Sequence, residues 1–377
     1  MEAVILAHVS TIRSRQLNGS AATIGIAWLF FACGLGSSCS GNAPVAAHDD
    51  SGEAQQLRIE HSSSVQWTGV AVSREKRVFV NYPRWRAGVG ISVAEILSDG
   101  RVKPYPSERW NSWNDTITEY SERFVCVQSV HVDDRNFLWV LDSGNPYLQG
   151  VRPGAAKLLC IDLSSDSVRS MYTFDSLKLS SARYLNDVRI DTDAGFAYIS
   201  ESGIGSLIVV DLASGRSRLL LDGHASTTGE FAPFVVDGVT VSLTIHCDGI
   251  ALTRDRTYLY FKPLSVAELF RIETRFLRDT SLSASELSSR VQFVANVGIC
   301  DGMEFGPDGG LYLTSLEHNA IKRLSPDLTL VTVVQDTRIK WPDTIAITED
   351  QVLYFTTSQI HLGAGATSPY YLFSYQI

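Results

Sequence analysis

Acidic and amide residues recur at one position of several short segments of the chain, each time just before or within an apolar run. These residues are Asn186, Asp187, Asp248, Asp301 and Asp343. Oxygen atoms from several strands are the ligands that calcium requires, and neighbouring carboxylates shift one another's pKa toward acid–base work. Turn formation before glycine is the alternative role for each residue. The pattern predicts that this cluster holds either a hard cation such as calcium or an amine, with Asp301 and Asp343 in contact with a small molecule.

A second group of acidic residues follows the second apolar run of several segments. Asp142 is well suited to a turn, whereas Glu201 and Glu317 are poorer turn formers and are therefore better candidates for moving a proton. His318 and Asn319 follow Glu317 directly, and we expect both to contact the ligand.

The segments that carry these residues form an internal repeat. Residues 301–324 contain one complete unit, in which short apolar runs flank the turn 307–310, and related units begin near positions 69, 129, 187, 248 and 343. Six units of about 40–60 residues, each reading as short strands between turns, are typical of the blades of a propeller. The sequence therefore predicts an all-β fold, a six-bladed β-propeller over residues 57–377, with a β-sandwich as the alternative.

In such a propeller the first strand of each unit lies innermost, so the aspartates converge on one end of a central channel. His131 lies on a predicted inner strand and is expected to line the channel, although a buried histidine with satisfied hydrogen bonds is the plainer interpretation. Residues 370–375 read as a strand that helps close the ring. A helix is expected over 283–291, in a loop.

The first residues carry the marks of an export signal. Arg13 and Arg15 precede an apolar run over 24–32 that is too short to span a membrane, and small residues lead to Cys39. Residues 1–39 are thus predicted to be a signal peptide, of the lipoprotein type with Cys39 lipidated or of the ordinary secretory type. Residues 40–56 read as a flexible linker. The protein is expected to be extracellular or periplasmic, with membrane contact only through that lipid anchor.

The net charge of the chain limits the classes of partner it is expected to bind, and the positions of its cysteines indicate which thiols are buried. The chain has 41 acidic and 32 basic residues, a net charge of -9 and a pI near 5.4, which argues against nucleic acid and favours cationic small molecules or metal ions. Cys126 and Cys160 lie in apolar strands and read as buried thiols. Cys247 and Cys300 precede equivalent Asp-Gly pairs and are candidates for a disulfide between neighbouring inner strands.

Several segments together resemble the yellow and major royal jelly protein family, from about Trp67 to the C-terminus. They are residues 78–85, 138–144, 157–163 and 301–321. The resemblance implies a secreted six-bladed propeller, in a family that includes dopachrome-converting enzymes and proteins that bind biogenic amines. Where the family commonly has Glu-Asn-Asn, this chain has Glu317-His318-Asn319. The lipoprotein-like leader suggests a bacterial member.

Three functional hypotheses follow. The first is an exported propeller that binds a catechol derivative or biogenic amine in its central channel, with isomerase activity of the dopachrome tautomerase type. In it, Glu317 or Glu201 moves the proton while Asp301 and Asn319 orient the substrate. The second takes its chemistry from the similar gluconolactonase-like propellers, as a calcium-dependent hydrolase of lactones or esters. This similarity implies Asn186, Asp248 and Asp301 as the calcium ligands. The third is a non-catalytic extracellular binding protein.

Overall fold

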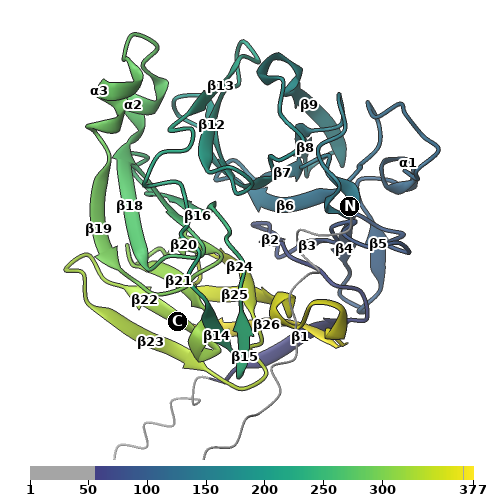
Figure 1. The fold of residues 1–377 in the computed structure, drawn as a ribbon. Helices are drawn as coiled ribbons and strands as arrows, with labels where there is room; N and C mark the ends of the chain where they lie inside the picture. Colours follow the sequence, from purple (N-terminus) through teal and green to yellow (C-terminus); the bar gives the residue numbers. More distant parts are fainter. Residues whose placement is uncertain (1–55, 368) are drawn as a thin grey trace, which may run out of the picture. The chain divides into compact units, whose positions relative to one another are not determined.

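Six four-stranded antiparallel sheets surround a central axis in the computed structural model, which describes residues 56–367 and 369–377 (Figure 1). The prediction of an all-β, six-bladed propeller is confirmed. The predicted signal peptide at 1–39 and nearly all of the linker at 40–56 lie outside the described residues. No helix among the described residues has the length and apolar character needed to cross a membrane.

Each blade has its strands in chain order from the axis outward. Blade 1 contains β2 (Val70–Val72), β3 (Val78–Asn81), β4 (Val93–Ile96) and β5 (Val102–Pro104). Blade 2 contains β6 (Val127–Val132), β7 (Phe137–Asp142), β8 (Lys157–Asp162) and β9 (Ser167–Thr173). Blade 3 contains β10 (Leu185–Asp191), β11 (Phe196–Glu201), β12 (Ser206–Asp211) and β13 (Ser217–Leu220).

The later blades follow the same order. Blade 4 contains β16 (Cys247–Leu252), β17 (Tyr258–Pro263), β18 (Glu268–Glu273) and β19 (Gln292–Asn296). Blade 5 contains β20 (Met303–Phe305), β21 (Leu311–Ser315), β22 (Ala320–Leu324) and β23 (Leu330–Gln335). Blade 6 combines β24 (Pro342–Ile347), β25 (Val352–Thr357) and β26 (Tyr370–Gln376) with β1 (Arg58–Ser63) from the start of the described chain.

The ring is closed by the pairing of β1 with β26, in which Ile59 lies opposite Phe373. The predicted strand over 370–375 is thus confirmed as the third strand of the closing blade. β1 supplies the fourth strand, so the two ends of the described chain share one sheet and hold the first and last blades together.

Few helices interrupt this pattern. The α-helices are α1 (Glu108–Asn111), α2 (Thr274–Arg278) and α3 (Ala284–Ser288), and the 3-10 helices are η1 (Pro146–Leu148), η2 (Asp175–Leu177), η3 (Leu316–His318) and η4 (Ile360–Gly365). The helix expected over 283–291 is α3, which begins with a capping box between Ser283 and Glu286. A hairpin of β14 (Phe234–Val236) and β15 (Val239–Val241) separates blades 3 and 4.

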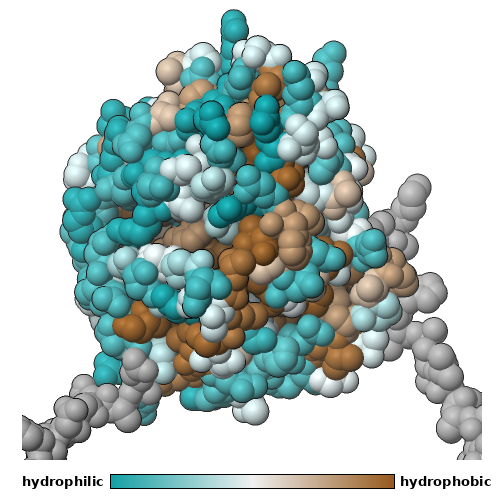
Figure 2. All heavy atoms as spheres, turned by 90° about the vertical axis from the view of Figure 1, so that its left-hand side faces the viewer, coloured by the Kyte–Doolittle hydropathy of each residue, from teal (hydrophilic) through white to brown (hydrophobic). Residues whose placement is uncertain are grey.

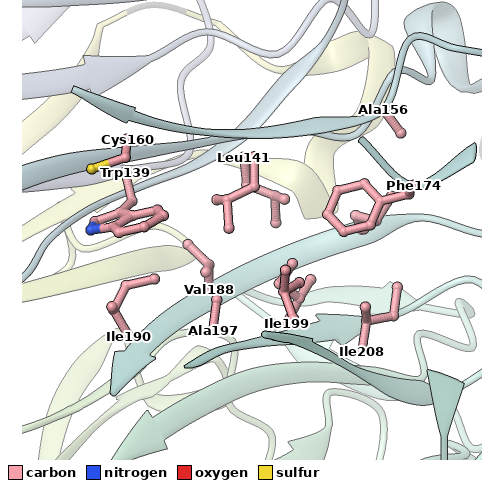
Figure 3. Close-up of a cluster of buried hydrophobic side chains, with 13 residues drawn as sticks. Trp139, Leu141, Ala156, Cys160, Phe174, Val188, Ile190, Ala197, Ile199 and Ile208 are labelled. Carbon is pink, nitrogen blue, oxygen red and sulfur yellow. The ribbon is translucent and has the colours of Figure 1, made fainter. Parts of the chain in front are cut away.

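The core lies between blades rather than at the axis. Figure 3 shows the cluster between blades 2 and 3, where Trp139 and Leu141 of β7 face Val188 and Ile190 of β10, all of them buried. Each blade presents two apolar faces and can bury them only against its neighbours. On the face of the molecule that carries β19 and β23, Figure 2 shows apolar residues that remain at the surface.

β-bulges mark the start of four inner strands. The pairing register shifts between Val127 and Ser129, between Leu185 and Val188, between Cys247 and Ile250, and between Pro342 and Ile345. A bulge removes a residue from the ladder and re-aims its side chain. The repeated polar residues lie in or beside these bulges, which frees their side chains for the channel end.

Glycine allows neighbouring inner strands to meet there. A Cβ atom on Gly249 would lie 2.2 Å from the carbonyl oxygen of Asp301, and one on Gly302 would lie 2.3 Å from that of Asp343. The Gly302 amide instead donates a hydrogen bond to the Asp343 carbonyl at 2.9 Å. The Asp-Gly pairs of the repeat are therefore a packing requirement as well as a source of carboxylates.

The four described cysteines are buried free thiols. The candidate bridge between Cys247 and Cys300 does not form, because Cys247 packs in the apolar cluster between blades 3 and 4 while Cys300 packs in the cluster between blades 4 and 5. Cys126 and Cys160 are buried as expected.

Candidate functional site

Four aspartates and one asparagine meet at one end of the channel. We call Asn186, Asp187, Asp248, Asp301 and Asp343 the aspartate layer; all five side chains are more than nine-tenths buried, and each keeps a small exposed fraction. They come from blades 3, 4, 5 and 6. As the repeat predicts, all five lie at or just before the start of an inner strand: Asn186, Asp187, Asp248 and Asp343 lie within the bulges described above, and Asp301 precedes β20, which has no bulge.

A chain of hydrogen bonds enters the layer from blade 1. Trp85 Nε1 donates to the Tyr184 hydroxyl at 2.7 Å, and that hydroxyl donates to Gln128 Oε1 at 2.7 Å. Gln128 Nε2 then donates to Asn186 Oδ1 at 3.3 Å. Asn186 Nδ2 donates to Asp248 Oδ2 at 2.7 Å. The direction of donation is fixed along the chain, so Asp248 receives a donor on one oxygen only.

Asp301 is held from the other side by Trp341, whose Nε1 donates to Asp301 Oδ2 at 2.7 Å. Trp341 is fully buried and has a backbone φ of 54°, a left-handed conformation that is strained for a bulky residue. Phe234 of the β14–β15 hairpin packs on its ring, and His361 stacks on it with an interplanar angle of 3°. The strain and packing fix an indole donor on one carboxylate.

Burial raises the pKa of every carboxyl group in the layer. Desolvation and the neighbouring carboxylates hold the pKa of Asp248 and of Asp343 well above the usual range. For Asp301, desolvation outweighs the Trp341 hydrogen bond and raises the pKa to about 6. The pKa of Asp187 is raised by burial as well, in spite of Arg189 nearby. Asp301 therefore ionises at a lower pH than Asp248 and Asp343 do.

One carboxyl oxygen of Asp248 is available to carry its proton. Asp248 Oδ1 is buried and has no hydrogen-bond partner among the described residues, while Oδ2 accepts from Asn186. The electrostatic interaction between the carboxyl groups of Asp248 and Asp301 links the pKa of one group to that of the other. A proton on Asp248 that faces Asp301 satisfies both groups, as in other pairs of buried carboxyl groups that share one proton.

A buried lysine lies close to this pair. Lys262 Nζ donates to the carbonyl oxygens of Pro263 at 2.7 Å and Val266 at 2.9 Å. Desolvation lowers its pKa, and the charges of Asp248 and Asp301 counter that effect. The hydrogen-bond partners of Lys262 are carbonyl groups, so its direct role is to stabilise the β17–β18 turn. Its effect on the aspartate layer is limited to a positive electrostatic potential.

The predicted calcium ligands Asn186, Asp248 and Asp301 do lie together, joined as described above. Among residues 56–367 and 369–377, however, no three His, Cys, Asp or Glu side chains are arranged to hold a metal ion. The Asn186 amide offers its NH2 group rather than its oxygen to Asp248. The donor set therefore fits a shared proton better than a hard cation.

Glu201, a predicted proton carrier, is fully buried and supports a loop. Its carboxylate accepts from Arg183 at 3.0 Å and from the backbone amides of Tyr184 at 2.9 Å and Gly203 at 2.8 Å. Asp142 does the same in blade 2, where it pairs with buried Lys157 at 2.9 Å. The hydrogen bonds that Glu201 accepts occupy its lone pairs, so the geometry does not support the catalytic role predicted for it.

Glu317, His318 and Asn319 lie on and just after η3, apart from the aspartate layer. Glu317 is exposed and bonds to no other described residue. His318 Nδ1 lies 3.1 Å from Ser315 Oγ, and Asn319 Nδ2 donates weakly to Asp237 Oδ1 at 3.5 Å. Nothing in these contacts joins the three residues to Asp301, and their predicted roles are without structural support.

The channel's other end is an open cavity of about 520 Å³ lined from all six inner strands. His131 lines this cavity, as expected for a channel residue, but none of the four aspartates does. Arg189 of β10 separates the two regions by reaching across to blade 5, where its Nη2 donates to the Met303 carbonyl at 2.7 Å. Its Nε lies 3.1 Å from Glu304 Oε2.

Sequence analysis missed several residues of the site. Gln128 occupies the same repeat position as Asn186 and could have been found from the repeat itself. Tyr184, Trp85 and Trp341 carry no such signal, because cross-blade packing alone brings them to the layer. For Trp341, the following Pro342 is the sole hint of an unusual backbone conformation.

Comparison with known proteins agrees with this architecture. The sequence model of the major royal jelly protein family matches residues 125–377. Protein yellow of Drosophila subobscura is 27% identical over 227 residues, which cover 54% of this chain and 38% of that protein. Dopaminechrome tautomerase of Drosophila melanogaster is 22% identical over 237 residues, 59% of this chain and 51% of the relative. The chain thus matches about half or less of the length of these relatives.

Among solved structures, a gluconolactonase from Xanthomonas campestris aligns with a TM-score of 0.54 at 12% identity, covering 85% of this chain and 90% of that one. At this identity the likeness concerns the fold. It places the six blades among propellers of the same kind.

Proposed function

Because the chain belongs to the major royal jelly protein family, we propose that it is an isomerase that moves a proton within a dopachrome-like catechol derivative bound at the aspartate layer. The observation that carries this proposal is the buried pair of Asp248 and Asp301, in which the pKa of Asp248 is held well above its usual range and the pKa of Asp301 is raised to about 6. A carboxyl group and a carboxylate side by side supply the acid and the base that a tautomerisation needs. The similarity to dopaminechrome tautomerase supports the substrate class.

The reaction conserves atoms and electrons. The Asp301 carboxylate removes a proton from the saturated ring carbon of the aminochrome, and the electron pair of that C–H bond moves through the ring toward the quinone oxygen. The Asp248 carboxyl group donates its proton to that oxygen. The proton then on Asp301 passes to Asp248, which restores the pair.

Aromatic and polar side chains surround the layer and suit a flat, bicyclic substrate. Trp85, Tyr184 and His246 are half-buried at the same end of the channel. Aromatic faces bind planar rings and iminium-like cations, and the carboxylates add a negative potential. With a predicted export signal at 1–39, we place this activity outside the cytoplasm.

The test is turnover of dopaminechrome by the full chain, followed by the loss of its visible absorbance. Asp301→Asn removes the base with little change of shape and should lower kcat/KM by about 100-fold or more. Asp327→Asn makes the same chemical change on an exposed turn and should leave the rate unchanged. Wild-type activity no higher than the uncatalysed rate, or full activity in Asp301→Asn, would refute the proposal.

One observation favours the calcium-dependent lactonase as a second candidate. The unpartnered Asp248 Oδ1 lies beside Asn186 and Asp301, and a cation in place of the proton would also satisfy it. The Asn186 amide would then have to rotate so that its oxygen faces the ion. Calcium that raises the melting temperature of the wild type but not of Asp248→Asn, together with hydrolysis of gluconolactone, would favour this candidate over the isomerase.

A further inference from the structure

The cavity at the end of the channel opposite the aspartate layer is built as a site of its own. Its volume of about 520 Å³ lies within the range of small-molecule sites. Every inner strand contributes to its wall, from β2 in blade 1 to β24 in blade 6. The propeller ring therefore encloses it on all sides, and the Arg189 side chain, which crosses from blade 3 to blade 5, separates it from the layer.

The wall of this cavity combines polar and apolar groups, and the apolar groups form a ring. Five blades place a half-buried apolar residue at the last position of the inner strand, and all five line the cavity: Val72, Val132, Leu252, Phe305 and Ile347. Half-buried apolar side chains around a concave surface gain free energy when a ligand removes them from water. The ring of apolar residues indicates a ligand with substantial apolar surface.

Most charged groups of the lining form ion pairs, whereas Arg74 and Asp133 bond to backbone or indole groups instead. Inside the cavity, Arg189 bonds to Glu304 and to two carbonyl groups. At the mouth, Lys76 pairs with Asp350, Arg254 with Glu349, and Arg256 with Asp134. A charged ligand would have to compete with these partners and would lose its own hydration. The site thus favours an uncharged ligand.

One polar group inside the cavity is free. His131 lines the wall, and within residues 56–367 and 369–377 its ring makes no hydrogen bond. Burial and the nearby Arg189 hold its pKa well below the usual range, so the ring is neutral. A neutral imidazole offers one N–H donor and one acceptor nitrogen, which matches a hydroxyl group.

We propose that this cavity is a second ligand site, which binds a neutral, mostly apolar molecule of the phenol class through a hydrogen bond between its hydroxyl group and His131. The aromatic ring of the ligand lies among the apolar residues that end the inner strands. The site is independent of the isomerase proposal, because its lining contains no residue of the aspartate layer.

The test is calorimetric titration of the full chain with naphthol, compared with naphthalene and naphthoate. Naphthol should bind with one site per chain. Naphthalene, which lacks the hydroxyl group, should bind about 5- to 10-fold more weakly, and naphthoate should not bind measurably. Equal affinity for naphthol and naphthalene, or tighter binding of naphthoate, would overturn the proposal.

Substitutions at His131 and Asp301 test where naphthol binds. His131→Phe should reduce naphthol affinity at least 10-fold and remove the preference over naphthalene, whereas His131→Asn keeps a donor and an acceptor and should retain most of both. Asp301→Asn should bind naphthol like the wild type. Loss of naphthol binding in Asp301→Asn, or an unchanged affinity in a folded His131→Phe, would place the ligand elsewhere and refute the assignment. His131→Asn provides the binding test if His131→Phe fails to fold.

Discussion

The two ends of the channel are formed by the same six inner strands but differ in whether their charged side chains are paired. At one end the aspartate layer brings four carboxyl groups together with mostly neutral partners, so burial raises their pKa values. At the other end most of the charged residues around the cavity form ion pairs with a residue of opposite sign. Carboxyl groups without a cationic partner are suited to moving protons, whereas charged groups that already form ion pairs leave the cavity available to a neutral ligand.

The local backbone explains the difference. Inner strands start with bulges and close glycine contacts, which force the polar side chains of adjacent blades together. They end in tight turns whose charged side chains extend over the mouth and find partners in other blades, as Arg256 does with Asp134. The aspartate layer is thus a tightly constrained arrangement of carboxyl groups. Four predictions test the contrast, in order of decreasing free-energy change.

The largest effect is expected from a methyl group at the contact between blades 5 and 6. Gly302→Ala would bring a Cβ atom to 2.3 Å from the Asp343 carbonyl oxygen and 3.0 Å from Thr344 Cα, both of them backbone atoms. We expect a loss of about 3 kcal/mol or more in the free energy of unfolding, measured by urea denaturation. Gly90→Ala is the control, because no atom lies within 4 Å of the position that its methyl group would take. Equal stability of both variants would show that the layer is not tightly packed.

The second prediction concerns Asp301 and the pH dependence of stability. Its folded pKa of about 6 lies above the unfolded value, so the proton stabilises the folded state fully below about pH 4, and this contribution is lost as the pH rises through 6. Asp301→Asn removes the unfavourable charge and should raise the free energy of unfolding at pH 7.5 by roughly 2 kcal/mol.

At pH 2.5 the same substitution should change stability little, since the carboxyl group is then protonated in both the folded and the unfolded state. Asp327→Asn, on an exposed turn, should be neutral at pH 7.5. Destabilisation of Asp301→Asn at pH 7.5 would mean that the carboxylate is favourably paired and that the layer resembles the cavity end after all.

These residues also show what the sequence could predict. The repeat of turns and short apolar runs was sufficient for six blades, since each unit carries its own strand pattern, and for the aspartates, since they share one position in that unit. Glu201 shares its repeat position with Asp142. In both blades the carboxylate at this position accepts hydrogen bonds from loop amides and pairs with a buried cation. The repeat pattern predicted a catalytic role for Glu201, which the structure does not support.

Contacts that cross the ring could not be predicted. Trp341 reaches Asp301 through an unusual backbone conformation, and Arg189 reaches Met303 across the channel. Arg189 and Met303 lie 114 positions apart, and Trp341 and Asp301 lie 40 positions apart in neighbouring blades, so no local sequence pattern encodes either contact.

The third prediction compares two buried tryptophan–aspartate hydrogen bonds, one at each end. Trp341→Phe removes the donor that lowers the pKa of Asp301, which should therefore rise by about one unit, equivalent to about 1.4 kcal/mol. Carboxyl titration by NMR and the pH–rate profile measure the shift. Trp139→Phe removes the matched bond to Asp133, 2.8 Å long, and should leave the pKa of Asp301 unaltered. A downward shift in Trp341→Phe would contradict the stated role of the indole.

The smallest effect is expected at the mouth of the cavity. The guanidinium group of Arg254 lies 2.8 Å from the Glu349 carboxylate, but their side chains are 48% and 78% exposed. Water and salt screen such a pair, so Arg254→Gln should change the free energy of unfolding by less than about 0.5 kcal/mol, with Arg101→Gln as a control in another exposed pair. If Arg254→Gln instead cost more than about 1 kcal/mol, the ion pairs would be holding blades 4 and 6 together, and the cavity end would be as tightly coupled as the aspartate layer. A small effect would leave the contrast intact, because the matched charges at the mouth would then serve mainly to keep the cavity free of an unpaired charge.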